Sequence, residues 1–137
     1  MAIRAIEDTK LDNIAVAIQN KDSGGQMTVD DMPNRIEQNL QSKKLQITLN
    51  ILYGANLATD GIFGNKTASA LPNICKGSAG DLTKVLQGFL ICHGYDTNGF
   101  DGIFGNATES AVRDFQKEND LYCDGIAGRA TFGKLAA

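Results

Sequence analysis

DGIFGNKT at residues 60–67, DGIFGNAT at residues 101–108 and DGIAGRAT at residues 124–131 are three copies of one pattern, D-G-I-x-G-x-x-T. A pattern repeated this closely in a chain of 137 residues indicates one supersecondary unit used again. The glycines suit a connection that needs positive φ or a close backbone approach, and the Asp side chain can fix a turn by accepting backbone N–H groups. We therefore predict a loop followed by a helix at each copy, with the Ile plugging the loop into the core together with Phe63 and Phe104 in the first two copies.

Four positions of each copy receive a structural role in this interpretation: the Asp, both glycines and the Thr, which is expected in the first turn of the following helix. They are Asp60, Gly61, Gly64, Thr67, Asp101, Gly102, Gly105, Thr108, Asp124, Gly125, Gly128 and Thr131. The same fold could also present these loops to a ligand, but holding the fold together is the simpler explanation.

The residues around the loops predict helices. Apolar residues from Leu82 to Leu90 recur at the spacing of one helical face, after a Gly-rich joint and with Asp81 as a plausible N-cap. A second helix is expected from about 106 to 118, because Asn106 and Glu109 have the spacing of a capping box. A short closing helix is expected at residues 131–135. The fold class is therefore all-α, with a compact three-helix bundle at residues 76–137.

A second level of repetition lies upstream. The 27 residues that begin at Leu45 resemble those that begin at Leu86, so residues 41–75 form a shortened copy of the unit. Leu45, Leu49 and Leu52 mark its first helix, and Pro72 stops a brief second helix.

Residues 1–40 differ from the repeats. Leu11, Ile14, Ala15 and Ile18 form an amphipathic helical face in what we interpret as an arm, which resembles a short helical element of phage tail and baseplate proteins. We expect the arm to mediate self-association or docking. Burial of the same face against the repeats stays open, because a two-helix piece must bury its apolar face somewhere.

Charge and composition exclude several classes of function. The net charge of −3 disfavours nucleic-acid binding, which needs clustered Lys and Arg. The sequence has no apolar run that would serve as a signal peptide or a membrane span. Cys75, Cys92 and Cys123 are expected to be reduced core residues, although their spacing leaves a disulfide open.

Residues 76–137 resemble the peptidoglycan-binding domain shared by many lysins, amidases and spore cortex hydrolases. The family shows L-Q-x-x-L, G-Y, D-G-x-F-G, T-x-x-A-V-x-x-F-Q, a Leu and a second D-G-x-x-G-x-x-T. Here these positions are Leu86, Gln87, Leu90, Gly94, Tyr95, Asp101, Gly102, Phe104, Gly105, Thr108, Ala111, Val112, Phe115, Gln116, Leu121, Asp124, Gly125, Gly128 and Thr131. The sequence departs from the family at Asn65 and Asn106, where Pro is frequent, and at Phe132, where Trp is common.

This resemblance implies a non-catalytic module that binds bacterial peptidoglycan, as the targeting part of a phage or prophage endolysin. Its partners would be peptidoglycan, an upstream catalytic domain or lysin chain and, through the arm, a second copy of the chain. Neither nucleic acid nor a membrane is expected as a partner. We expect synthesis in the bacterial cytoplasm without a signal peptide, and action at the cell wall. A phage structural or assembly protein that uses the repeats only as scaffold is the alternative.

Catalysis is not expected. Zinc hydrolases need three protein ligands, and His93 is the single histidine, so no metal or other cofactor is predicted. Cys92 and His93 are adjacent, and neighbours on a helix diverge by about 100°, so they cannot form a nucleophile pair. The chain therefore has no predicted catalytic residue.

Peptidoglycan offers N-acetyl sugars and peptides with amides and carboxylates, so a binding site should combine an aromatic ring with polar donors. Polar and amphipathic residues gather around the loops of the complete unit, and Arg113 could pair with a peptide carboxylate. The predicted ligand-binding residues are Tyr95, Asn98, Arg113, Gln116, Asn119 and Tyr122.

Overall fold

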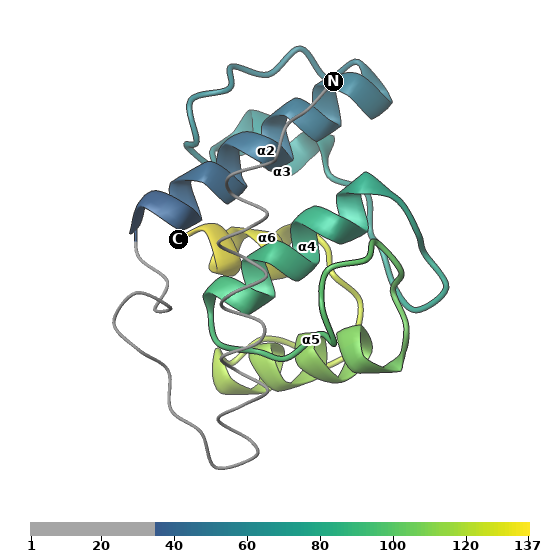
Figure 1. Ribbon diagram of the computed structural model, residues 1–137. Helices are drawn as coiled ribbons and strands as arrows, with labels where there is room; N and C mark the ends of the chain where they lie inside the picture. The colour runs from purple at the N-terminus through teal and green to yellow at the C-terminus, as the bar shows by residue number, and fades with distance from the viewer. Residues whose placement is uncertain (1–34) are drawn as a thin grey trace.

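The computed structural model describes residues 35–137, with side chains from residue 39 onward (Figure 1). This part of the chain contains five α-helices and no β-sheet. The helices are α2 (Arg35–Tyr53), α3 (Asn65–Ala70), α4 (Asp81–Cys92), α5 (Asn106–Glu118) and α6 (Arg129–Ala136). The all-α fold predicted from the sequence is confirmed for these residues.

α4 is the central helix of the fold. Figure 1 shows it between α2 on one side and α5 on the other, and α6 packs against it as well. The apolar face predicted from Leu82 to Leu90 is buried, and Gly88, Ile91 and Cys92 are buried too. A helix that is apolar around most of its circumference belongs in the middle of a bundle, because it has little polar surface to offer to water.

The shortened copy and the complete unit share one hydrophobic core. Leu45 and Leu49 of α2 are fully buried in the same cluster as Phe89 of α4 and Phe132 of α6. The rings of Phe89 and Phe132 meet edge to face, with centroids 6.3 Å apart. Because α2 contacts α4 and α6 directly, the first copy completes the core of the second.

The helix bounds follow local signals closely. α5 spans the predicted residues, Asn106–Glu118, and α3 ends at Ala70. Leu71 has ψ 127°, the extended conformation that a residue before proline favours, so Pro72 stops α3 as predicted. Two predicted caps are wrong, because a glycine occupies the N-cap of each helix: Gly80 precedes α4 and Gly105 precedes α5, neither with a side-chain cap.

The connection between α3 and α4 is tied to two of the repeated loops. Ile74 and Ala127 exchange backbone hydrogen bonds of 3.0 and 2.8 Å. Further along, Phe104 N–H donates to the Ser78 carbonyl at 2.9 Å, and Gly80 N–H donates to that of Gly102 at 2.9 Å. The Gly-rich joint before α4 is therefore anchored on the loop at residues 101–105.

Two predictions concern residues near the N-terminus. The amphipathic arm based on Leu11, Ile14, Ala15 and Ile18 lies outside the described residues. α2 begins at Arg35, so a single helix crosses the boundary that we placed at residue 40. Among the helices from residue 35 onward, none has the length and apolar character that would let it span a membrane.

None of the three cysteines forms a disulfide within the described part of the chain. Cys92 is buried in α4, as expected of a core residue. Cys75 and Cys123 are exposed, which corrects their prediction as core residues. The Cys123 thiol lies at the surface of α5, 3.5 Å from the Arg113 carbonyl oxygen.

Candidate functional site

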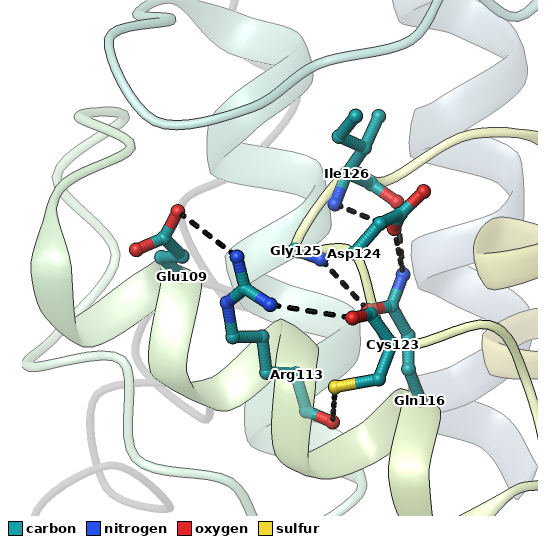
Figure 2. A network of polar contacts seen from close by, with 7 residues as sticks. All are labelled: Glu109, Arg113, Gln116, Cys123, Asp124, Gly125 and Ile126. Carbon is teal, nitrogen blue, oxygen red and sulfur yellow. Dashed lines mark hydrogen bonds and ion pairs between the residues drawn. The ribbon is translucent and has the colours of Figure 1, made fainter.

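Each repeated loop is held by one buried glutamine. In the third loop (residues 124–128), Gln116 Nε2 lies 3.0 Å from Asp124 Oδ1, 2.9 Å from the Ile126 carbonyl oxygen and 3.1 Å from Thr131 Oγ1. Gly125 N–H donates to Gln116 Oε1 at 3.0 Å, and Figure 2 shows how the glutamine reaches into the loop. Both polar atoms of the amide are thus used inside the fold. We call this arrangement the glutamine clamp.

The same clamp recurs in the other two loops. Gln87 of α4 holds the second loop (residues 101–105) through Asp101, the Ile103 carbonyl, Thr108 and Gly102, at 2.9–3.3 Å. Gln46 of α2 holds the first loop (residues 60–64) through the equivalent atoms at 2.8–3.3 Å. The structural role predicted for the Asp, the first Gly and the Thr is accounted for by these contacts.

The Asp of the loop also binds its own backbone. Asp101 Oδ1 accepts the Ile103 N–H at 2.9 Å, and Asp60 Oδ1 accepts the Ile62 N–H at the same distance. These backbone hydrogen bonds, with a second contribution from the clamp amide, hold the pKa of both carboxyl groups below the usual value. The ionised form is therefore the one that stabilises the loops.

The first glycine of each loop has the left-handed conformation. Gly61, Gly102 and Gly125 have φ values of 79°, 80° and 74°. At Gly102 a Cβ atom would also lie 3.1 Å from the Gly80 carbonyl oxygen. The second glycine is different in the first two loops, since Gly64 and Gly105 have negative φ and nothing within 4 Å of an added Cβ. In the third loop an added Cβ at Gly128 would clash with the Asn73 side chain. Glycine is thus required mainly at the first position.

The isoleucine of the motif does not plug into the core. Ile62 is 69% exposed and Ile103 60%, and Ile126 is exposed as well. Its backbone carbonyl accepts from the clamp amide, so the backbone at this position faces inward and the side chain faces solvent. The prediction holds for the following residue, since Phe104 is 1% exposed and Phe63 is partly buried against the core.

The predicted ligand-binding residues do not form one cluster. Tyr95 packs edge to face on Phe115 with centroids 5.7 Å apart, and its hydroxyl donates to Glu118. Partial burial and the Glu118 carboxylate raise the pKa of the phenol. Asn119 donates its side-chain amide to the Phe115 carbonyl at 2.9 Å. Tyr95 and Asn119 are thus both anchored around the C-terminal half of α5.

Asn98 lies in a separate turn. Its φ is 57°, and its backbone N–H donates to Asp96 Oδ1 at 2.8 Å. Its side chain is exposed. The left-handed conformation is one that Asn tolerates better than most residues, which gives Asn98 a role in the turn.

Gln116 and Arg113 have structural contacts in Figure 2. Gln116 is 1% exposed and fully engaged in its clamp, so we reassign it from the ligand-binding set to the structural set. Arg113 donates to the Cys123 carbonyl at 3.3 Å and lies 4.0 Å from Glu109 on the same helix. Its guanidinium packs over the third loop, where a Cβ at Gly125 would be 3.1 Å from Arg113 Nε.

Tyr122 has a highly accessible side chain, at 84% exposed. It lines a groove of about 250 Å³ beside the third loop, together with Leu121, Ile126, Asn73 and Arg129. We call this the loop-3 groove. It combines an aromatic ring, an aliphatic side chain, an amide and a cation, which suits a ligand with an apolar face and a carboxylate. The Asp124 carboxylate also lines the groove, with Oδ1 hydrogen-bonded to Gln116 and to the Ile126 N–H.

Asn73, Ile126 and Arg129 were missed by the sequence analysis. Ile126 could have been included among the predicted ligand-binding residues. An apolar residue that is the same in all three copies can be exposed as well as buried. Arg129 stands where the other loops have Asn65 and Asn106, so the difference between copies was also a signal. Asn73 lies beside the groove because the neighbouring residue, Ile74, forms a β-bridge with Ala127. No pattern in the sequence predicts this bridge.

The site has no evident centre for a metal. Within residues 35–137 no group of three His, Cys, Asp or Glu side chains is placed to hold an ion. His93 ends α4, where its Nε2 lies 2.7 Å from the Leu135 carbonyl oxygen and its ring packs on Phe115. A carbonyl oxygen can only accept, so Nε2 is the donor in this contact.

Comparison with known proteins identifies a family for the C-terminal part of the chain. Residues 79–135 match the family described as a putative peptidoglycan binding domain. A peptidoglycan-binding protein from Clostridioides difficile, solved in complex with glutamine hydroxamate, is 43% identical, with a TM-score of 0.46. That match covers 47% of this chain and only 40% of the Clostridioides difficile chain. No curated protein matches the chain.

The SleB N-terminal domain is 35% identical, with a TM-score of 0.46. The match covers 54% of this chain and 93% of that domain. Identity at this level over nearly a whole solved domain agrees with the family match at residues 79–135. On these grounds the chain belongs to the peptidoglycan-binding domain family.

Proposed function

We propose that this protein is a non-catalytic module that binds bacterial peptidoglycan and directs a cell-wall hydrolase of the phage or prophage lysin type to the wall. The observation that carries the proposal is the loop-3 groove on a family scaffold. The clamp residues use their polar atoms inside the fold and cannot contact a ligand. The ligand must therefore be bound by side chains that are accessible to solvent. In the loop-3 groove these include Tyr122 and Arg129.

The chemistry of the groove fits a wall fragment. The exposed Tyr122 ring can stack on the apolar face of a sugar, and Ile126 can pack on an acetyl methyl group. Arg129 can form a bidentate pair with a peptide or lactyl carboxylate, and the amide of Asn73 can bind a neighbouring carbonyl or hydroxyl.

The proposal is tested by sedimentation of the full chain with purified sacculi. We expect the parent to pellet with sacculi without releasing reducing sugar or free amine. Arg129→Asn, which installs the residue found in the other two loops, should weaken binding roughly tenfold, the effect of losing one charge-assisted hydrogen bond. Tyr122→Ala should weaken binding as well.

Ile126→Ser and Ile103→Ser form a matched pair, because both residues are exposed at the same position of the motif. We expect only Ile126→Ser to reduce binding. A parent chain that stays in solution would contradict the proposal and favour the structural or assembly protein. Lysis of the sacculi by the pure chain would contradict the non-catalytic assignment.

A further inference from the structure

We propose that the shortened copy carries a second ligand site, which binds the N-acetylmuramic acid unit of the wall glycan. The inference rests on the proposed function and deepens it. The site is a groove of about 530 Å³ between the turn after α2 and the short helix α3. Its lining residues are Tyr53, Ala55, Asn56, Leu57, Asn65, Lys66, Ser69 and Ala70. We call it the α3 groove.

The size and lining of the α3 groove are those of a small-ligand site. Its volume lies within the range of roughly 300–1,000 Å³ that such sites occupy. Tyr53 is 55% exposed and follows Ile51 and Leu52, which are 58% and 47% exposed. An exposed apolar run beside a hollow with polar groups is typical of a binding surface.

The wall of the groove is pre-formed. Asn50 holds the backbone of Leu57 from both sides: its Nδ2 donates to the Leu57 carbonyl at 3.0 Å, and its Oδ1 accepts the Leu57 N–H at 2.6 Å. Asn56, next to it, has φ 56°. A turn fixed by two side-chain hydrogen bonds loses little further freedom when a ligand binds.

Two lining residues of this groove, and one residue that supports it, have no counterpart in the second copy. Aligning the copies from Leu45 and Leu86 places Tyr53 against Gly94 and Lys66 against Ala107, and places the supporting Asn50 against Ile91. The clamp residues are the same in both copies, and none of the three changed residues contributes to a clamp. The clamps therefore do not account for Tyr53 and Lys66, and Asn50 acts by fixing the turn that carries the groove.

The groove chemistry matches N-acetylmuramic acid. This sugar presents an apolar ring face, an acetamide, hydroxyl groups and a lactyl carboxylate. Tyr53 can stack on the ring, and the small apolar side chains of Ala55 and Ala70 leave room for a methyl group. The Lys66 ammonium supplies the positive charge for the carboxylate. The loop-3 groove has the same combination of a tyrosine and a cation, so one chain can grip two positions of the wall.

The test is a ¹H–¹⁵N NMR titration of the full chain with N-acetylmuramic acid, with N-acetylglucosamine as the ligand that lacks the carboxylate. We expect the backbone amides of α3 and of residues 55–57 to shift with N-acetylmuramic acid and to shift much less with N-acetylglucosamine. Lys66→Ala, which installs the residue of the second copy, should lower the affinity for N-acetylmuramic acid, as measured from these shifts, roughly tenfold. Tyr53→Ala should weaken it too.

Arg129→Asn is the matched control, because it alters the loop-3 groove and should leave the α3 shifts unchanged. Absence of α3 shifts in the parent, or equal affinity of Lys66→Ala and the parent, would overturn the second site. Sedimentation with sacculi separates this result from the proposed function. If the parent pellets and neither Lys66→Ala nor Tyr53→Ala pellets less, the second site alone is wrong; if the parent does not pellet, the proposed function is wrong.

Discussion

The shortened copy and the complete unit contain the same glutamine clamp but end in different helices. Gln46 and Gln87 hold their loops through equivalent atoms at nearly equal distances. The helix after the first loop, α3, has 6 residues, of which Thr67 is buried. The helix after the second loop, α5, has 13 residues and buries an apolar face. The clamp is therefore a local device, and the length of the following helix decides whether the copy encloses its own core.

The missing helix of the shortened copy is replaced by contacts with the complete unit. Phe63 of the first loop lies beside α6, where a Cβ on Gly133 would be 3.4 Å from its ring. Phe104, at the same position of the second loop, is 1% exposed within the shared core. One phenylalanine thus covers an outer edge of the core, whereas the other fills its interior.

The largest expected difference between the copies concerns these two rings. Phe104→Ala should destabilise the protein by about 3–5 kcal/mol, because it leaves a cavity in the core. Phe63→Ala should destabilise it by about 1–2 kcal/mol, since the half-buried ring loses less apolar contact. Urea unfolding of both variants measures the difference, and equal losses would show that the shortened copy is as central to the core as the complete unit.

The next effect tests whether the clamp matters equally in both copies. Gln87→Leu and Gln46→Leu should each destabilise the fold by about 2–4 kcal/mol, because buried loop donors and acceptors lose their partner. Gln41→Leu on α2 is the control: Gln41 is 1% exposed, and its Oε1 has no hydrogen-bond partner in the described part of the chain. Thermal unfolding should show little change for this control. A Gln46→Leu variant as stable as the parent would limit the clamp to the complete unit.

A smaller effect is expected at the first glycine of a loop. Gly102→Val and Gly125→Val should each destabilise the fold by about 1–3 kcal/mol, because a β-branched residue is strained at φ 80° or 74°. Gly105→Val is the matched control, since Gly105 is extended and has open space at its Cβ. Unchanged denaturation midpoints at both Gly102 and Gly125 would refute the structural role of the motif.

The smallest effect is the acid sensitivity of the first and second loops. Asp60 and Asp101 have a lower pKa in the folded chain than their ordinary value of 3.8. Their contribution to stability is therefore complete above pH 3.8 and is lost as the pH falls below that value through the folded-state pKa. Stability measured from pH 6 to 2 should fall less steeply for Asp101→Asn than for the parent. If stability fell equally with pH in the parent and in Asp101→Asn, ionisation of the Asp101 carboxyl group would not contribute to folding stability.

Short-range patterns in the sequence were sufficient for the helices and the loops. The spacing of apolar residues gave α4, Pro72 gave the end of α3, and the repeat gave three equivalent loops. These features depend on neighbours a few residues apart, where backbone preference and periodicity act directly. The all-α fold and the family could therefore be predicted without coordinates.

Only the tertiary structure decided which side chains of the loops are accessible. Gln116 is polar and was predicted to bind a ligand, but it reaches Asp124 in the following loop and is buried there. Ile103 is apolar and was predicted to be buried, but its backbone is turned inward by Gln87, 16 residues away in the sequence. Polarity and periodicity do not specify such contacts, because the direction of a loop side chain depends on where the folded chain places its hydrogen-bond partners. The two grooves have the same origin, since each is formed by segments that meet only when the helices pack.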